Sequence, residues 1–273
     1  MLPNFLIVGT MKSGTTSLAH NLRLHPDIFV ANGELHFFNT KRYDKGLEDY
    51  ASSFEEVKDE LLVGEKTPSY YQLEMVRDRI YKHFPDMKLI WIFRNPVSRA
   101  YSHFRFFQWR GLEYRSFRKV VNQEFKKRPK NFTMRYVERG EYSTFVKMYL
   151  DVFPKENCLF LKYEDYKANP EKVVNEVIQF LKPGAEFFKL EQSKRVNVTR
   201  NTRFPIVNYI ITKIYLKLGF GYALLRLIKG WNQKKNTPPP KMDQDIKARL
   251  KEHYIPFNKE LQELTQLELS DWN

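Results

Sequence analysis

The sequence predicts an α/β fold in which a central parallel β-sheet of about five strands is flanked by helices and followed by a C-terminal helical lid region. Short apolar runs alternate with helical patterns along most of the 273 residues, as expected for βαβ units. These runs are apolar at nearly every position, which is typical of strands covered on both faces. Hydrophobic residues make up 42% of the chain, which is enough to bury such a sheet and argues against a disordered chain.

The expected elements alternate in chain order. Strands are predicted at 5–8, 28–30, 61–63, 88–93 and 158–161. Helices are predicted at 15–24, 73–83, 96–107, 142–152 and 170–181. Pro96 and Pro170 each fit the first turn of a helix, where the missing N–H group costs no hydrogen bond.

The character of the sequence changes after residue 190. Residues 192–204 are polar and basic and predict a loop, whereas 205–229 are mostly apolar with interspersed lysine and arginine. The latter predict an amphipathic helical pair that breaks near Gly219 and Gly221. A polar, proline-rich linker is expected at 232–240 and a final helix at 243–264. We therefore expect one domain over 1–273, with a core at 1–190, a basic loop and helical region at 191–240, and a C-terminal helix and tail at 241–273.

The charge of the chain indicates an anionic partner. Lysine and arginine number 46 against 32 acidic residues, so the formal net charge is +14. Nucleic acid, anionic lipid, acidic polysaccharide and nucleotide all satisfy this criterion, and charge alone does not choose among them.

The single cysteine, Cys158, excludes an intrachain disulfide and favours a reducing compartment. The first residues lack the basic and apolar regions of a signal peptide. No uncharged apolar stretch reaches the roughly 18 residues of a spanning helix. These features predict a cytoplasmic protein, or a luminal one if a leader or anchor was removed, and they leave its oligomeric state open.

The strongest local signal is GTMKSGTTS at 9–17, between a predicted strand and a predicted helix. Its glycines allow a turn in which backbone N–H groups converge on an anion at the start of a helix. Lys12 supplies a cation, and the hydroxyl groups of the loop supply further donors; they belong to Ser13, Thr15, Thr16 and Ser17. The fold is therefore expected to be P-loop-like and to bind a phosphate-like group.

The loop departs from the Walker A pattern. Gly9 and Gly14 have the required separation, but Thr15 stands where that pattern has lysine. The strand at 88–93 is followed by Arg94 instead of an aspartate that would hold Mg²⁺. We therefore expect no metal. A P-loop kinase or NTPase stays open as an alternative, as does a basic nucleic-acid-binding protein, although no recognised nucleic-acid motif is present.

The loop resembles the 5′-phosphosulfate-binding loop of the sulfotransferases that use 3′-phosphoadenosine-5′-phosphosulfate (PAPS). Further blocks match the same family in the same order: GELHFF at 33–38, GEKTPSY at 64–70, FRNPVSRAYS at 93–102, YEDY at 163–166 with NP at 169–170, and LSDW at 269–272. The resemblance covers nearly the whole chain. It points to the carbohydrate branch, which includes heparan sulfate sulfotransferases, and to bacterial natural-product relatives.

The resemblance implies in-line transfer of a sulfuryl group from PAPS to a hydroxyl or amine, with release of PAP and without a metal. It makes Lys12 the cation at the leaving group and Glu34 the general base. Lys66 would hold the sulfonate or an anionic acceptor; its competing interpretation is a salt bridge with Glu65 or a neighbouring acid. His36 would orient Glu34 or contact the acceptor, and either His36 or His103 would be the next candidate base. At position 33 this chain has glycine, where relatives often carry lysine before this glutamate, so the acceptor site lacks that positive charge.

The resemblance also implies the nucleotide contacts and makes 1–190 the nucleotide-binding core. Residues Lys12, Ser13, Gly14, Thr15, Thr16 and Ser17 would surround the 5′ end. Arg94 and Ser102 would hold the 3′-phosphate, and Arg200 or Arg203 would complete that site. The acceptor is expected to be a carbohydrate or a small-molecule natural product, lined by residues 102–130 and 205–229. The apolar segment 205–229 is alternatively a lid helix over the sheet or a contact with an anionic membrane.

Overall fold

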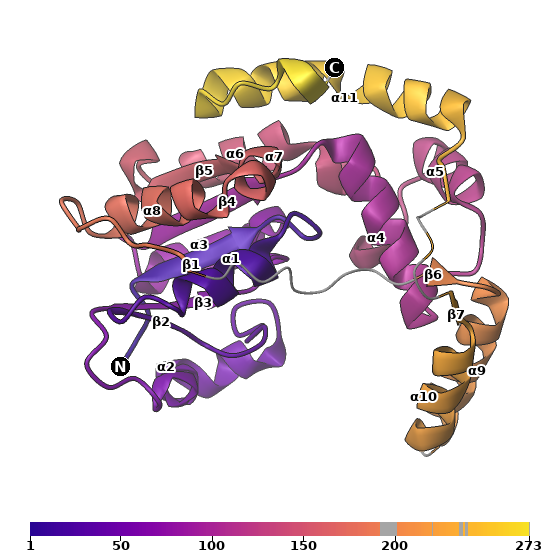
Figure 1. The fold of residues 1–273 in the computed structure, drawn as a ribbon, viewed down its shortest axis with the longest axis horizontal. Helices are drawn as coiled ribbons and strands as arrows, with labels where there is room; N and C mark the ends of the chain where they lie inside the picture. Colours follow the sequence, from indigo (N-terminus) through magenta and orange to yellow (C-terminus); the bar gives the residue numbers. More distant parts are fainter. Residues whose placement is uncertain (192–200, 220, 235–236, 238–239, 273) are drawn as a thin grey trace. The chain divides into compact units, whose positions relative to one another are not determined.

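The computed structural model describes residues 1–191, 201–219, 221–234, 237 and 240–272 (Figure 1). They fall into two compact units, and the chain passes through each more than once. Unit 1 comprises Met1–Arg94, Tyr142–Asn197 and Phe257–Asp271, and unit 2 comprises Asn95–Glu141, Val198–Pro256 and Trp272–Asn273. The expected single domain, with its divisions at 190 and 240, stays a prediction.

Unit 1 contains the five-stranded parallel sheet, as predicted. The strands are β1 (Phe5–Gly9), β2 (Ile28–Val30), β3 (Leu62–Lys66), β4 (Lys88–Phe93) and β5 (Cys158–Lys162), in the order β2-β3-β1-β4-β5. Phe5 on the central strand lies opposite Gly64 on one side and Lys88 on the other. A Cβ atom at Gly64 would lie 2.4 Å from the Phe5 ring, so this pairing requires glycine.

The strand order reverses at β1. After β1 the chain builds β2 and β3 on one side of it and then crosses to build β4 and β5 on the other. In open parallel sheets, ligands bind beyond the carboxyl ends of the strands at such a reversal. The loop at 10–14 and Arg94 follow β1 and β4 at this edge.

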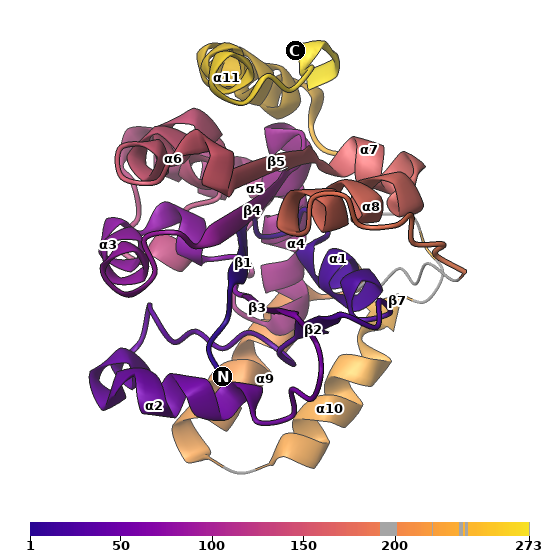
Figure 2. The same cartoon turned by 90° about the vertical axis from the view of Figure 1, so that its left-hand side faces the viewer.

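Helices cover both faces of the sheet in unit 1 (Figure 2). They are α1 (Thr15–Leu22), α2 (Gly46–Ala51), α3 (Glu74–His83), α6 (Tyr142–Leu150), α7 (Tyr163–Ala168) and α8 (Pro170–Leu181). On one face, α1 and α8 bury Leu18, Leu22 and Val174 against the apolar residues of β1 and β4. On the other face, Tyr71 and Tyr149 pack edge-on against the Trp91 ring.

The described residues of unit 2 are helical apart from loops and one short strand pair. Its helices are α4 (Pro96–Arg110), α5 (Phe117–Lys126), α9 (Pro205–Leu218) and α10 (Tyr222–Trp231). The pair β6 (Asn201–Thr202) and β7 (Gln233–Lys234) is antiparallel. Helix α11 (Gln244–Thr265) continues from unit 2 into unit 1 and contains Pro256.

Most predicted elements are present within a few residues of their expected bounds. The predicted pair of helices at 205–229 is confirmed, with its break at Gly219–Gly221. Helices α2, α5 and α7 were not predicted, and β7 lies in the segment expected to be a linker. Among the described residues, no helix combines the length and the apolarity needed to cross a bilayer.

Candidate active site

The loop between β1 and α1 turns back at Gly14. The φ angle of Gly14 is 90°, in the left-handed region, and a Cβ atom there would lie 2.9 Å from the Tyr163 ring. Any other residue would therefore meet both backbone strain and a clash. The turn places the loop at the N-terminus of α1, where the first N–H groups of a helix have no intrahelical acceptor and favour an anion.

Two buried hydroxyl groups hold the loop in shape. The backbone N–H and the hydroxyl of Thr10 both donate to the carbonyl of Ile92 on β4, at 2.9 and 3.1 Å. The Thr10 and Ser13 hydroxyl oxygens are 2.7 Å apart. Thr15 and Ser17 are buried and Thr16 is half-buried in the first turn of α1. The contacts predicted between these hydroxyl groups and PAPS stay predictions.

Lys12 and Arg94 bring two cations to this loop. The guanidinium group of Arg94 donates to the Lys12 carbonyl at 3.2 Å, and it lies 5.0 Å from the centroid of the Tyr163 ring. Burial and the positive charge of Arg94 lower the pKa of Lys12 to about 8, and the negative charge of Glu34 offsets this only in part. Lys12 and Arg94 repel each other at this distance, and a bound anion with several negative charges would relieve that repulsion.

Glu34 lies between Lys66 and His36, two of the other three predicted catalytic residues. Its Oε1 accepts a hydrogen bond from Lys66 Nζ at 2.9 Å, and its Oε2 is 3.3 Å from His36 Nε2. Burial alone would raise the pKa of Glu34, but the hydrogen bonds and charges of His36 and Lys66 together lower it to about 2. The hydrogen bond to Glu34 raises the pKa of His36, despite its partial burial. The three side chains therefore form one cluster with an ionised carboxylate at its centre.

The salt bridge between Lys66 and Glu65, weighed from the sequence, is not observed. Glu65 is fully buried beneath the cluster. It accepts hydrogen bonds from the hydroxyl groups of Thr67 at 2.7 Å, Tyr50 at 2.8 Å and Tyr70 at 3.1 Å. Alternate residues on β3 point to opposite sides, so Glu65 and Lys66 face different surroundings although they are neighbours.

The buried Glu65 network supports the segment that carries Glu34 and His36. The Thr67 hydroxyl accepts a hydrogen bond from the backbone N–H of His36 at 3.3 Å. The Tyr70 hydroxyl accepts one from the N–H of Phe38, also at 3.3 Å. His36 itself has a positive φ of 52°, an uncommon conformation that such contacts help to hold.

The remaining predicted residues lie elsewhere or outside the described ranges. Arg94 belongs to unit 1 and Ser102 to unit 2, on α4, so their joint contact with a 3′-phosphate stays a prediction. Arg200 lies outside the described residues. His103 is fully buried, with its ring centroid 4.5 Å from that of Phe107 and 4.7 Å from that of Tyr136, which argues for a packing role.

Two residues that shape the site, Glu65 and Tyr163, were not predicted from the sequence to do so. Tyr163 packs where a side chain at Gly14 would lie and also supports the Arg94 guanidinium group. Both residues stand in blocks that match the family pattern, and that was the only signal available for them. An isolated glutamate beside a lysine otherwise predicts a solvated surface pair.

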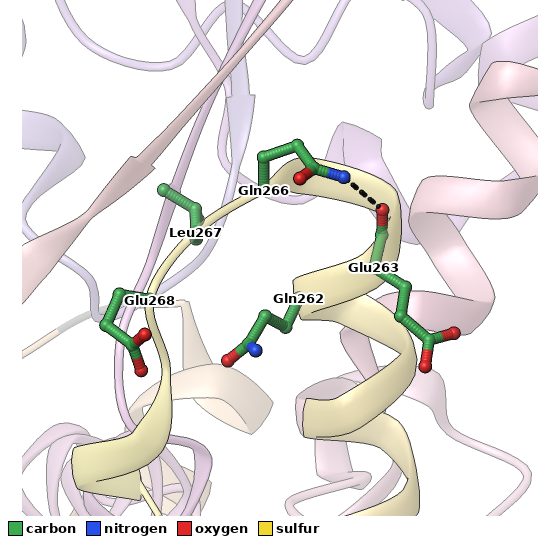
Figure 3. A pocket seen from close by; sticks show the side chains of 5 residues that line it. All are labelled: Gln262, Glu263, Gln266, Leu267 and Glu268. Atoms are coloured by element: carbon green, nitrogen blue, oxygen red, sulfur yellow. Dashed lines mark hydrogen bonds between the residues drawn. The ribbon is translucent and has the colours of Figure 1, made fainter.

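A pocket in unit 1 lies at the C-terminal end of α11 (Figure 3). It is lined by Gln262, Glu263, Gln266, Leu267 and Glu268. Its polar groups serve the local backbone, since Gln266 donates to the Glu263 carbonyl at 2.8 Å and Glu268 accepts from the Ser270 N–H at 2.8 Å. None of the predicted site residues lines it, so we do not assign it to the active site.

Comparison with known proteins decides the family. Residues 2–217 match the model described as the sulfotransferase domain. This chain is a sulfotransferase. The predicted reaction class is thereby confirmed, and the kinase or NTPase alternative is dropped. The family uses PAPS as the sulfuryl donor.

This sulfotransferase is similar over nearly all of its own length to several known proteins. It is 32% identical to heparan sulfate glucosamine 3-O-sulfotransferase 6 from Homo sapiens over 263 residues, which cover 96% of this chain and 72% of the relative. It is 29% identical to heparan sulfate glucosamine 3-O-sulfotransferase 3B1 from Homo sapiens over 267 residues, covering 97% and 63%. The crystal structure of a sulfotransferase from Alicyclobacillus acidocaldarius matches with a TM-score of 0.75 at 24% identity, covering 100% of this chain and 99% of the other. The last comparison supports the fold.

Proposed function

We propose that this sulfotransferase transfers the sulfuryl group of PAPS to a hydroxyl group of an acidic carbohydrate, with Glu34 as general base. The observation that carries the proposal is the ionised Glu34 carboxylate, held between Lys66 and His36. The excess of lysine and arginine favours an acidic acceptor, and the relatives that are 32% and 29% identical are named for heparan sulfate.

The proposed reaction is a single displacement at sulfur. Glu34 accepts the proton of the acceptor hydroxyl as its oxygen forms a bond to sulfur. The bond between sulfur and the 5′-phosphate oxygen breaks, and its electron pair stays on PAP. Lys12 neutralises the charge that develops on this oxygen, supported by N–H groups at the start of α1. Arg94, Ser102 and Arg200 are proposed to hold the 3′-phosphate.

In this proposal Lys66 also links donor binding to the basicity of Glu34. With a pKa of about 2, Glu34 is ionised but is a weak proton acceptor. When the sulfonate of PAPS attracts Lys66, the carboxylate loses its closest cation and its pKa rises. Donor binding would then strengthen the base only when the sulfuryl group is in place.

Transfer of labelled sulfuryl groups from PAPS tests the proposal. The protein is incubated with an acidic oligosaccharide, a neutral oligosaccharide or a small hydrophobic alcohol. We expect label on the acidic oligosaccharide and a loss of about 10²- to 10⁴-fold in kcat for Glu34→Gln, with PAP affinity unchanged in calorimetry. Label confined to the small alcohol would overturn the acceptor assignment, and a full rate in Glu34→Gln would overturn the base.

A further inference from the structure

The hairpin formed by α9 and α10 in unit 2 turns polar side chains inward. Asn208 is 0% exposed and Thr212 is 6% exposed. They donate hydrogen bonds to the carbonyl groups of Trp109 at 3.2 Å and Arg110 at 3.3 Å, at the end of α4. Asn232, which follows α10, donates to Asn208 Oδ1 at 2.8 Å. The hairpin is thus held to the rest of its unit by polar contacts.

The outward side of the hairpin is apolar. On α9 the residues four apart at 206, 210, 214 and 218 share one face of the helix. Ile206, Ile210, Ile214 and Leu218 are between 44% and 51% exposed. On α10, Leu227 is 71% exposed and Trp231 is 61% exposed. A surface helix of a globular protein normally buries its apolar face, so this arrangement is reversed.

The charges of the hairpin indicate what covers this face. Residues 205–231 include four cations, Lys213, Lys217, Arg226 and Lys229, and no aspartate or glutamate. A second copy of the same hairpin would bring like charges together, which disfavours self-association. Apolar side chains accompanied only by cations suit an anionic lipid surface, where acyl chains meet the former and headgroups the latter.

We infer that the α9–α10 hairpin is a membrane-surface anchor for anionic lipid. Helix α9 has 14 residues. At about 1.5 Å per residue it is too short for the hydrocarbon core of about 30 Å, so it lies in the interface and does not span it. The polar contacts of Asn208 and Thr212 fix the hairpin to α4 and leave its isoleucine face available to lipid. This inference is independent of the acceptor.

Co-sedimentation of the full chain with vesicles tests the anchor. The vesicles contain phosphatidylcholine alone or phosphatidylcholine mixed with phosphatidylserine. We expect binding to the mixed vesicles that salt weakens, and a loss of about tenfold or more in the double variant Ile210→Ser, Ile214→Ser. The matched control is Ile255→Ser, since Ile255 is an isoleucine of similar exposure, 49%, outside the hairpin. PAP binding confirms that each variant is folded.

Tryptophan fluorescence provides a second readout. Trp231 is 61% exposed, whereas Trp91 and Trp272 are buried. On mixed vesicles we expect a blue shift of the emission and quenching by brominated lipid, both absent in Trp231→Phe. Failure to bind either vesicle, or unchanged binding of the double isoleucine variant, would overturn the inference. If the wild type sediments as a dimer without vesicles and the double isoleucine variant sediments as a monomer, the apolar face instead binds a second copy of the chain.

Discussion

The surroundings of Lys12 destabilise its protonated form as long as no anion is bound. Its pKa of about 8 is lowered by burial and by Arg94, and a bound phosphosulfate would raise it. If the protonated form binds the anion, as proposed, PAP affinity should be full below pH 8 and should fall by up to about tenfold per pH unit as the pH rises through that value. Binding near pH 8 should therefore take up a proton.

Calorimetry in two buffers of different ionisation enthalpy measures this proton uptake. The observed heats should differ between the buffers for the wild type and for Lys41→Met, which removes an exposed lysine. They should agree for Lys12→Met. Equal heats in the wild type would contradict the role of Lys12.

Lys66 is one of the two cations that lower the pKa of Glu34, together with His36. The proposed base is the Glu34 carboxylate, so activity should be present above its pKa and should be lost as the pH falls through it. The pKa of about 2 keeps this loss below the usual assay range. Because Lys66→Met removes one of the two cations, it should raise the pKa and move the acid limb of kcat/KM into the range from about pH 4 to 6.

The shape of the pH profile separates this effect from a simple loss of rate. Lys66→Met is also expected to be slower, because Lys66 has a proposed role at the sulfonate. If Lys66→Met is slower but keeps the wild-type pH dependence of kcat/KM, Lys66 binds the sulfonate and does not lower the pKa of Glu34.

Glu65 is a positioning residue for the acid–base cluster. It is fully buried and accepts three hydrogen bonds, and burial raises its pKa despite them. Glu65→Gln replaces one acceptor oxygen with a donor and should lower the free energy of unfolding by about 1 to 3 kcal/mol. Because Thr67 and Tyr70 hold the backbone at His36 and Phe38, kcat should fall while PAP affinity stays unchanged.

A purely structural role for Glu65 predicts a different result. The unfolding free energy would change, but the pH profile of kcat/KM in the folded variant would match the wild type. We expect instead an acid limb at higher pH, since displacement of the segment that carries Glu34 and His36 separates Glu34 from Lys66 on β3.

At the scale of elements, Gly111 sets how closely α9 approaches α4. Its φ is 75°, and a Cβ atom would lie 2.2 Å from the carbonyl oxygen of Asn208. Gly111→Ala should therefore lower the free energy of unfolding by about 1 to 3 kcal/mol, measured by chemical denaturation. Gly219→Ala is the matched control, because Gly219 also has a positive φ of 71° but no atom within 4 Å of the added methyl group. Equal losses in the two variants would argue against the close approach.

The strands were predictable where burial makes them uniformly apolar. The prediction at 88–93 has the bounds of β4, whereas the prediction at 61–63 ended too early because β3 continues through the polar pair Glu65 and Lys66. Helix α5 was missed because Glu124 occupies a buried position on its apolar face. That carboxylate accepts the backbone N–H groups of Tyr136, Val137 and Glu138, contacts that no local pattern indicates.

The site was predictable only in part, for a related reason. The loop residues from Lys12 to Ser17 are close in sequence, so their chemistry is visible as one motif. Glu34 and Lys66 are 32 positions apart, and only the family resemblance placed both at the reacting centre. The hydrogen bonds of Glu65 depend on tyrosines from two other segments, so its role required the structure.

At the scale of the whole molecule, the net charge of +14 should act on acceptor binding over distance. Added salt screens interactions beyond about 10 Å at 0.1 M. For an acidic oligosaccharide, kcat/KM should therefore fall as salt increases, mainly through KM. A neutral acceptor assayed in parallel should show a much smaller change, and equal salt dependence for both would contradict electrostatic attraction of the acceptor.

The central position of β1 also determines when, during synthesis, the loop that follows it can fold. β1 is made first, yet its partners are β3 and β4, and Thr10 closes its loop on Ile92, 82 residues later. A nascent chain that has not yet released β4 from the ribosome thus exposes an apolar strand and has no framework for its anion loop. The anion-binding loop is translated before the strands that hold it and takes shape only after long-range pairing, so β1 is where a chaperone would be needed most.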